Sequence, residues 1–260
     1  MIEVALFIAA LFTVPWIIRP LLPPPSGSLS SFLIAFLPSV WTPTILAIVF
    51  VIVRDGPAGL RKELRARLGY RSGSARSILF AGMVPIAAVA IAVLIARAAG
   101  GAAPFIESSA LMQAILLQII TGAVGEELGW RGFVVPRLGK LAGPTAAAWM
   151  MGILWSLWHV PAFFDPNLPH YFMPIYVVLP FIAFFGVFLG FMFNRAGESV
   201  LATMTAHLSL NIMIALGGVS LTSSVYWGVL AGVFGAMAIV MTLTSRAHAR
   251  PHHRKPAEAQ

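Results

Sequence analysis

Residues 110–132 have the sequence ALMQAILLQIITGAVGEELGWRG, in which an apolar run is followed by the adjacent carboxylates Glu126 and Glu127 and then by Arg131. Ionisable side chains inside a membrane segment are costly, so they are rare and usually mark a functional site. The stretch therefore predicts a polar site inside a bundle of membrane helices. The other strong polar residues within apolar stretches are His159, His207 and Asn211.

The composition of the chain supports a membrane protein. Of its 260 residues, 59% are hydrophobic and 10% are charged, whereas a soluble domain carries about 25% charged residues. The net charge is +8, but the basic residues cluster in short polar segments, which indicates a membrane topology signal and no nucleic-acid partner. The chain has no cysteine, which excludes a disulfide, a thiolate metal site and a thiol nucleophile.

Apolar runs of about 20 residues predict membrane-spanning helices, and we expect an all-α protein with about eight of them. The expected spans are residues 1–22, 32–53, 78–99, 109–135, 144–164, 172–193, 199–216 and 224–244. Residues 54–76 form a polar segment whose middle, 58–68, predicts a short amphipathic helix on the membrane surface. We expect one transmembrane domain over residues 1–245, with a core at about 110–216, and a basic, disordered cytoplasmic tail at 246–260.

The basic residues divide unevenly between the two sides of such a bundle. Two of the seventeen, Arg19 and Arg97, fall on one side, and Arg131 belongs to the motif. The other side receives Arg54, Arg61, Lys62, Arg65, Arg67, Arg71, Arg76, Arg137, Lys140, Arg195, Arg246, Arg250, Arg254 and Lys255. Because Lys and Arg accumulate in cytoplasmic segments, we expect both termini to be cytoplasmic in a multi-pass cell-membrane protein.

The spacing of the Glu pair predicts different roles for the two carboxylates. Glu127 and Arg131 are four residues apart, share a helix face and can form an ion pair. Glu126 lies about 100° away around the helix and can point elsewhere. We therefore expect Glu127 and Arg131 to support the site, and Glu126 to remain available as a general base or acid.

The histidines and the asparagine complete this chemistry. His207 and Asn211 are also four residues apart, so both can donate hydrogen bonds to one developing oxyanion. His159 can hold the far side of a water molecule that Glu126 activates. These groups are sufficient for amide hydrolysis without serine, cysteine or a metal ion.

The three motifs together resemble the CPBP family of intramembrane glutamic endopeptidases, which includes the CAAX prenyl proteases of type 2 and the bacterial Abi proteins. The family's Glu-Glu-x-x-x-Arg motif is matched in full by Glu126, Glu127 and Arg131. Its Phe-x-x-x-His motif ends at His159, but Trp155 stands in place of the Phe. Its His-x-x-x-Asn motif is His207 with Asn211, so the motifs cover about a third of the chain.

This resemblance implies roles for individual residues. Glu126 would be the catalytic glutamate that activates water, assisted by His159. His207 and Asn211 would form the oxyanion hole. Trp155 replaces one aromatic ring by another, so we expect the site to persist with altered packing or pocket shape. The expected partners are a peptide or protein substrate, membrane-associated or lipidated, and the lipid bilayer, with no cofactor.

One feature of the spacing conflicts with such a site. If the helices on either side of the turn at residues 136–143 begin level, His159 lies about 7 Å deeper than Glu126. A tilt, or a fourth helix that continues past Pro136, would remove the difference. Both remain open from the sequence.

Two other classes of function remain open as well. Two histidines and a glutamate are a legitimate zinc set, so a membrane metalloprotease is the first alternative. A non-catalytic immunity-type or transport protein is the second. We expect His170, in the loop after residue 164, and the tail histidines to be solvated. The sequence does not identify the substrate.

Overall fold

The computed structural model describes residues 2–24, 29–70, 74–101 and 115–249, and every regular element in them is helical. The α-helices are α1 (Ile2–Ile18), α2 (Leu29–Leu68), α3 (Ser74–Ala98), α5 (Val124–Glu127), α6 (Val135–Ala142), α7 (Pro144–His159), α8 (Ile175–Arg195), α9 (Val200–Leu216) and α10 (Ser224–Ala249). Short 3-10 helices are η1 (Arg19–Leu21), η4 (Val160–Phe164) and η5 (Pro169–Phe172). Two π-helical segments, η2 (Ile119–Ala123) and η3 (Leu128–Val134), flank α5.

The all-α, polytopic membrane architecture expected from the sequence is confirmed. In the described residues, six helices are long and apolar enough to cross a membrane. Two further expected spans correspond to α9, which has 17 residues, and to the segment that carries the Glu pair. The start of that last segment, residues 109–114, lies outside the described residues, as do residues 250–260 of the expected tail. Helix α10 reaches Ala249, so the first four residues of that tail are helical.

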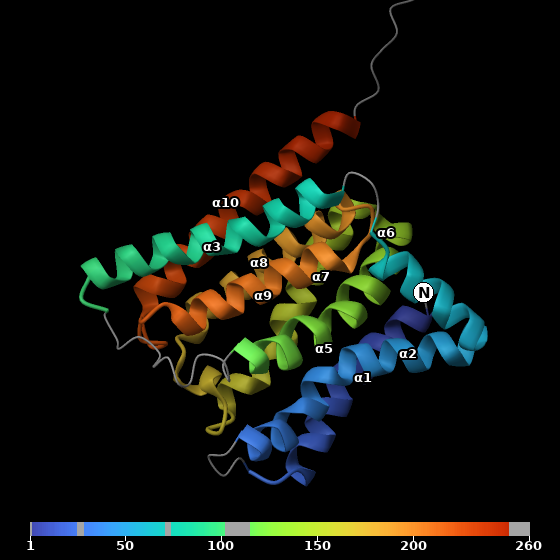
Figure 1. Ribbon diagram of the computed structural model, residues 1–260, viewed down its shortest axis with the longest axis horizontal. Helices are drawn as coiled ribbons and strands as arrows, with labels where there is room; N and C mark the ends of the chain where they lie inside the picture. The colour runs from blue at the N-terminus through green and yellow to red at the C-terminus, as the bar shows by residue number, and fades with distance from the viewer. Residues whose placement is uncertain (1, 25–28, 71–73, 102–114, 250–260) are drawn as a thin grey trace, which may run out of the picture.

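Helix α5 lies in the middle of the bundle, between α2 on one side and α9 on the other (Figure 1). Helices α7 and α8 pack against each other through small residues, since a Cβ atom on Gly152 would lie 2.4 Å from the backbone oxygen of Ala183. A Cβ atom on Gly186 would in turn lie 2.7 Å from the Cα of Gly152. Such close backbone contact is the usual way in which membrane helices associate, and it brings Trp155 of α7 against Phe185 of α8.

The polar segment after the second span is more helical than expected. The sequence predicted a polar segment from residue 54; α2 runs to Leu68 in two helical parts, which meet at a kink at Gly56, where φ is 69° and ψ is −176° and the torsion angles are not helical. The amphipathic helix expected at residues 58–68 is present as the last part of α2. After the kink the chain lies at the same end of the bundle as the N terminus and α6 (Figure 1).

The helix that carries the Glu pair continues past Pro136, so the turn predicted at residues 136–143 is wrong for all but its last residue. Helix α6 ends at Ala142 and the chain turns at Gly143, where φ is 82°. Pro136 lies in the first turn of α6, where the π-helical segment η3 ends, and the helix continues through it. Glu126 is then sixteen residues from Ala142 and His159 is fifteen from Pro144, which removes the difference in depth between them.

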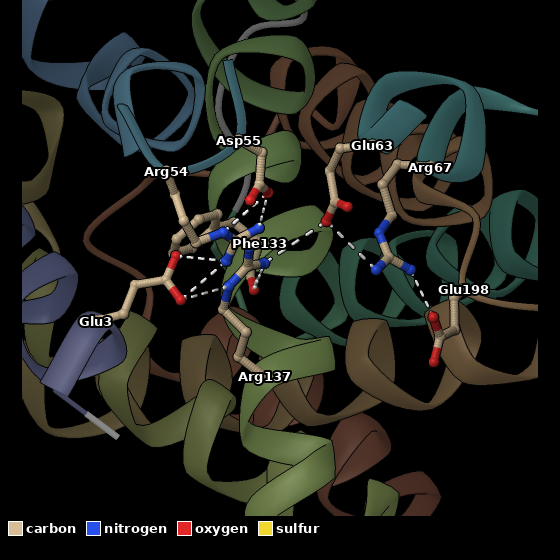
Figure 2. A network of polar contacts seen from close by, with 8 residues as sticks. All are labelled: Glu3, Arg54, Asp55, Glu63, Arg67, Phe133, Arg137 and Glu198. Atoms are coloured by element: carbon tan, nitrogen blue, oxygen red, sulfur yellow. Dashed lines mark hydrogen bonds and ion pairs between the residues drawn. The ribbon is translucent and has the colours of Figure 1, made fainter. Parts of the chain in front are cut away.

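At the end of the bundle that holds the N terminus and α6, an ionic network connects four segments (Figure 2). Arg137 of α6 lies 3.5 Å from Glu3 of α1 and 3.6 Å from Glu63 of α2. Arg67 pairs with Glu63 and with Glu198, which lies two residues before the start of α9. The elements that carry Glu126 and His207 are therefore joined to α1 and α2 by charged contacts outside the apolar bundle.

Candidate active site

Glu127, Arg131 and His207 form a fully buried chain of polar contacts. Arg131 Nη1 donates to Glu127 Oε1 at 3.0 Å, which confirms the expected pairing, and both side chains have no exposed surface. His207 Nδ1 lies 2.8 Å from the same Glu127 oxygen. A carboxylate can only accept, so Nδ1 of His207 carries the proton in this contact. Glu127 thus joins the helix of the Glu pair to α9 and sets the orientation of the His207 ring.

Glu126 turns away from this chain, as the helical spacing predicted. It is 6% exposed, and its Oε2 accepts a hydrogen bond of 2.7 Å from Trp155 Nε1 on α7. The Trp155 ring also lies 4.5 Å from the Arg131 guanidinium and meets the rings of His159 and His207 edge-on. Trp155 therefore contacts the Glu pair's helix and both site histidines.

His159 is held in one orientation by its own helix. Its Nδ1 lies 2.7 Å from the backbone oxygen of Trp155, which can only accept, so Nδ1 is the protonated nitrogen. In the neutral ring, Nε2 then keeps a free lone pair. The ring lies among Trp155, Trp158 and His170, with centroids 5.0 to 5.7 Å away.

His207 and Asn211 lie side by side against the segment before the Glu pair. A Cβ atom on Gly122 would come 2.6 Å from Asn211 Nδ2 and 3.7 Å from His207 Nε2. Only glycine leaves room for the Asn211 amide in this position. The two side chains predicted to act together are thus adjacent, at the wide turn of η2.

All four residues expected to take part in chemistry line one cavity of about 510 Å³. Glu126 and His159 contribute from α5 and α7, and His207 and Asn211 from α9. The rest of the wall is largely apolar and includes Phe181, Ile182, Phe185, Leu210, Ile214 and Trp227. Such a cavity, apolar with a few convergent polar groups, has the form of a ligand site.

A loop residue that the sequence analysis placed in solvent also belongs to this cavity. His170 lines it, its ring centroid is 5.7 Å from that of His159, and its Nδ1 is buried with no hydrogen-bond partner in the described part of the chain. Burial lowers the pKa of His170 to about 4. The expectation of a solvated His170 is therefore wrong. Only the Pro-His and aromatic context of residues 169–172 could have suggested that this loop folds inward.

The same loop is attached to η1, directly after α1, by an ion pair. Arg19 Nε lies 3.0 Å from Asp165 Oδ2, and the Arg19 guanidinium lies over the Phe36 ring of α2 at 4.9 Å. Burial raises the pKa of Asp165, but hydrogen bonds from Asn167 and the charge of Arg19 outweigh it, and the net pKa is lowered. Arg19 also lines the cavity, so η1, directly after α1, contributes to its wall together with this loop.

The site donors do not form a ready metal site. Among the described residues, no three His, Asp or Glu side chains are grouped closely enough to share a metal ion. Glu127 is instead occupied by Arg131 and His207, and Glu126 by Trp155. The arrangement suits hydrogen bonding to a substrate and a water molecule.

Fold and site together define a polytopic helical membrane protein with a buried glutamate, histidine and asparagine site around one cavity. Residues 108–213 match the family described as "Type II CAAX prenyl endopeptidase Rce1-like". A similar curated protein is the "CAAX prenyl protease 2" of Methanococcus maripaludis (strain DSM 14266), 28% identical over 104 residues. That match covers 38% of this chain and 38% of the relative. The resemblance inferred from the three motifs is confirmed: residues 108–213 are similar to the type II CAAX prenyl endopeptidases, and the chain spans well under half the length of the curated relative that it matches.

Proposed function

We propose that this protein is an intramembrane endopeptidase that hydrolyses a peptide bond of a membrane-associated or lipidated substrate with a glutamate-activated water. The observation that carries the proposal is the convergence of Glu126, His159, His207 and Asn211 on one largely apolar cavity. The curated relative is named for the cleavage of CAAX prenyl proteins, which makes a prenylated peptide the first substrate to test.

In the proposed reaction, a water molecule lies between Glu126 and Nε2 of His159. Glu126 takes a proton from the water as the oxygen attacks the substrate carbonyl. The resulting oxyanion accepts hydrogen bonds from Asn211 Nδ2 and His207 Nε2, which are adjacent across Gly122. Glu126 then delivers its proton to the departing amine, so that the products are a carboxylic acid and an amine.

The His207 contact specifies the form in which this histidine would act. Because Nδ1 donates to Glu127, a neutral ring has no proton on Nε2 and cannot donate to an oxyanion. The imidazolium form can. It also balances the charges of the buried site, since Glu126 and Glu127 are then matched by Arg131 and His207. Glu127 and Arg131, the supporting residues, thus stabilise both the oxyanion hole and the fold.

The test is peptide cleavage by the purified full-length protein in detergent. The substrates are a prenylated peptide ending in a CAAX sequence, the same peptide without the prenyl group, and a library of unmodified peptides. Wild type is compared with Glu126→Gln, with and without a strong chelator. Cleavage that is lost in Glu126→Gln and insensitive to the chelator supports the proposal.

The other outcomes favour the alternatives. Cleavage that the chelator abolishes would favour a zinc-dependent membrane metalloprotease. Equal cleavage by wild type and Glu126→Gln would contradict the role of Glu126. Absence of cleavage across all three substrate sets would favour a non-catalytic, immunity-type or transport role.

We also propose that both termini face the cytoplasm, on the basis of the uneven distribution of basic residues. Because the chain has no cysteine, single cysteines report the topology directly. Lys140→Cys, at the end of the bundle that carries the ionic network, should resist a membrane-impermeant maleimide in intact cells. Asn167→Cys, in the loop beside the cavity, should react. The reverse pattern would overturn the orientation.

A further inference from the structure

The position at which this chain departs from the family motif makes a polar contact with the expected catalytic glutamate. Where the motif has Phe, Trp155 donates its indole N–H to Glu126 Oε2 at 2.7 Å. A phenylalanine ring has no such donor. We propose that Trp155 is a positioning residue that fixes the Glu126 carboxylate with Oε1 turned to the cavity, an inference that rests on the proposed function.

The surroundings of Trp155 explain why it can hold this position. The side chain is 3% exposed, and its ring is packed between the Arg131 guanidinium and the rings of His159, Phe185 and His207. These contacts leave the indole little rotamer freedom. Because the fixed indole N–H holds Oε2, the Glu126 carboxylate has fewer orientations available. This favours the geometry in which Oε1 reaches a water molecule.

The first readout is kinetic and uses a matched control. Trp155→Phe restores the family residue and keeps an aromatic ring, but it removes the indole N–H donor together with part of the ring system. We expect its kcat to fall about ten- to a hundredfold with KM nearly unchanged, the loss that one hydrogen bond to a charged group gives. Trp149→Phe is the control, because Trp149 on the same helix donates to Thr242 at 2.9 Å, away from the cavity. It should keep the wild-type kcat.

The second readout does not depend on activity. In the protein labelled with ¹⁵N-tryptophan, the indole N–H signal that disappears in Trp155→Phe belongs to Trp155. This signal should move upfield in Glu126→Ala and stay in place in Glu63→Ala. A Trp155 signal that ignores Glu126→Ala, or an unchanged kcat in Trp155→Phe, would overturn the inference. If the wild-type protein cleaves no peptide, the proposed function is contradicted. The NMR spectra still test the hydrogen bond between Trp155 and Glu126.

A separate observation supports a second inference, at the last part of α2. Residues 57–68 have two faces. Leu60, Glu63, Leu64 and Arg67 face the bundle and line a small cleft with Phe133. Arg61, Lys62 and Arg65 lie on the other face and are exposed.

Exposed apolar residues precede and follow these three cations along the chain, and they indicate what the cations contact. Val53, directly before the network, is 82% exposed, and Leu68 and Tyr70 at the other end are 39% and 65% exposed. An exposed cationic face between exposed apolar residues has the character of a helix at a membrane interface. We propose that Arg61, Lys62 and Arg65 bind the headgroups of anionic phospholipids.

The test is thermal unfolding of the full-length protein in detergent with added phosphatidylglycerol or phosphatidylcholine. Phosphatidylglycerol should raise the Tm of wild type more than phosphatidylcholine does. The triple variant R61Q/K62Q/R65Q should lose this difference. The control R76Q/K140Q/R195Q removes three other exposed cations and should keep it. An equal response to both lipids in wild type, or the same loss in both variants, would overturn the proposal.

Discussion

His207 Nδ1 and Glu127 Oε1 lie 2.8 Å apart, and Arg131 Nη1 donates to the same oxygen at 3.0 Å. One carboxylate therefore holds a cation of its own helix and a histidine eighty residues further along the chain. This contact separates the two neighbouring glutamates into a residue that organises the site and a residue that faces the cavity. The different roles of Glu126 and Glu127 can be tested by mutation.

Glu127→Ala should unfold the protein at a much lower temperature than Glu126→Gln. Removal of Glu127 leaves Arg131 buried without its carboxylate, a change that costs about 3 to 5 kcal/mol in buried ion pairs. Glu126→Gln keeps an oxygen that can accept the Trp155 N–H, so its Tm should stay close to that of wild type. Thermal unfolding in detergent measures both. A similar Tm for the two variants would contradict the separate roles.

His207→Ala and Asn211→Ala should each reduce kcat about a hundred- to a thousandfold with little change in KM, since both would remove a donor to the oxyanion. The double variant should lose far less than the product of the two effects, because residues that act as a unit are not additive. Steady-state kinetics on the cleaved peptide gives both results. Fully multiplicative effects would argue against a shared oxyanion.

Gly122→Ala should reduce kcat up to about a hundredfold with the fold retained, because the new Cβ atom would lie 2.6 Å from Asn211 Nδ2 and displace the amide. Gly139→Ala is the matched control on α6, where no atom lies within 4 Å of the added Cβ. It should leave kcat unchanged and stabilise the helix by about 0.5 to 1 kcal/mol. Equal activity of the two variants would show that the Asn211 position is not critical.

The stability of the protein should fall as the pH is lowered from 6.5 towards 4. Burial lowers the pKa of His170 from 6.5 to about 4, so over this range the unfolded chain binds a proton at His170 that the folded protein does not. Excess proton binding by the unfolded state reduces stability. The Tm of His170→Gln should vary less with pH than that of wild type. His159 lies beside the same ring and is retained in both proteins, so the difference reports His170 together with its interaction with His159.

Much of the fold follows from the sequence because apolar length alone determines where helices cross a bilayer. The Glu127–Arg131 pair and the opposite direction of Glu126 followed from helical spacing in the same way. The convergence of His159, His207 and Asn211 on one cavity could be expected because polar residues in apolar helices must face one another. Their catalytic roles remain predictions.

Other features depend on tertiary contacts that spacing does not reveal. His170 lines the cavity in a loop that the Arg19–Asp165 pair joins to η1, and nothing local to residue 170 predicts that pairing. The Trp155 hydrogen bond joins α7 to Glu126 of α5, while the same side chain packs against Gly186 and Phe185 of α8. The end of the fourth helix was placed too early because proline was read as a stop signal, whereas Pro136 occupies the first turn of α6.

The π-helical segment Leu128–Val134 has a consequence for insertions and deletions in this protein. A π-helix holds more residues per turn than an α-helix, so this segment is out of phase with an ordinary helix of equal length. The seven π-helical residues turn through about the same angle as six residues of an α-helix, which advance about 100° each. Deleting one residue there would therefore let the chain close as an α-helix with Glu126 and Arg137 in about their present relative orientation. The wide turn thus holds one surplus residue, and we expect this segment to tolerate the loss of one residue better than the α-helical parts of the bundle do.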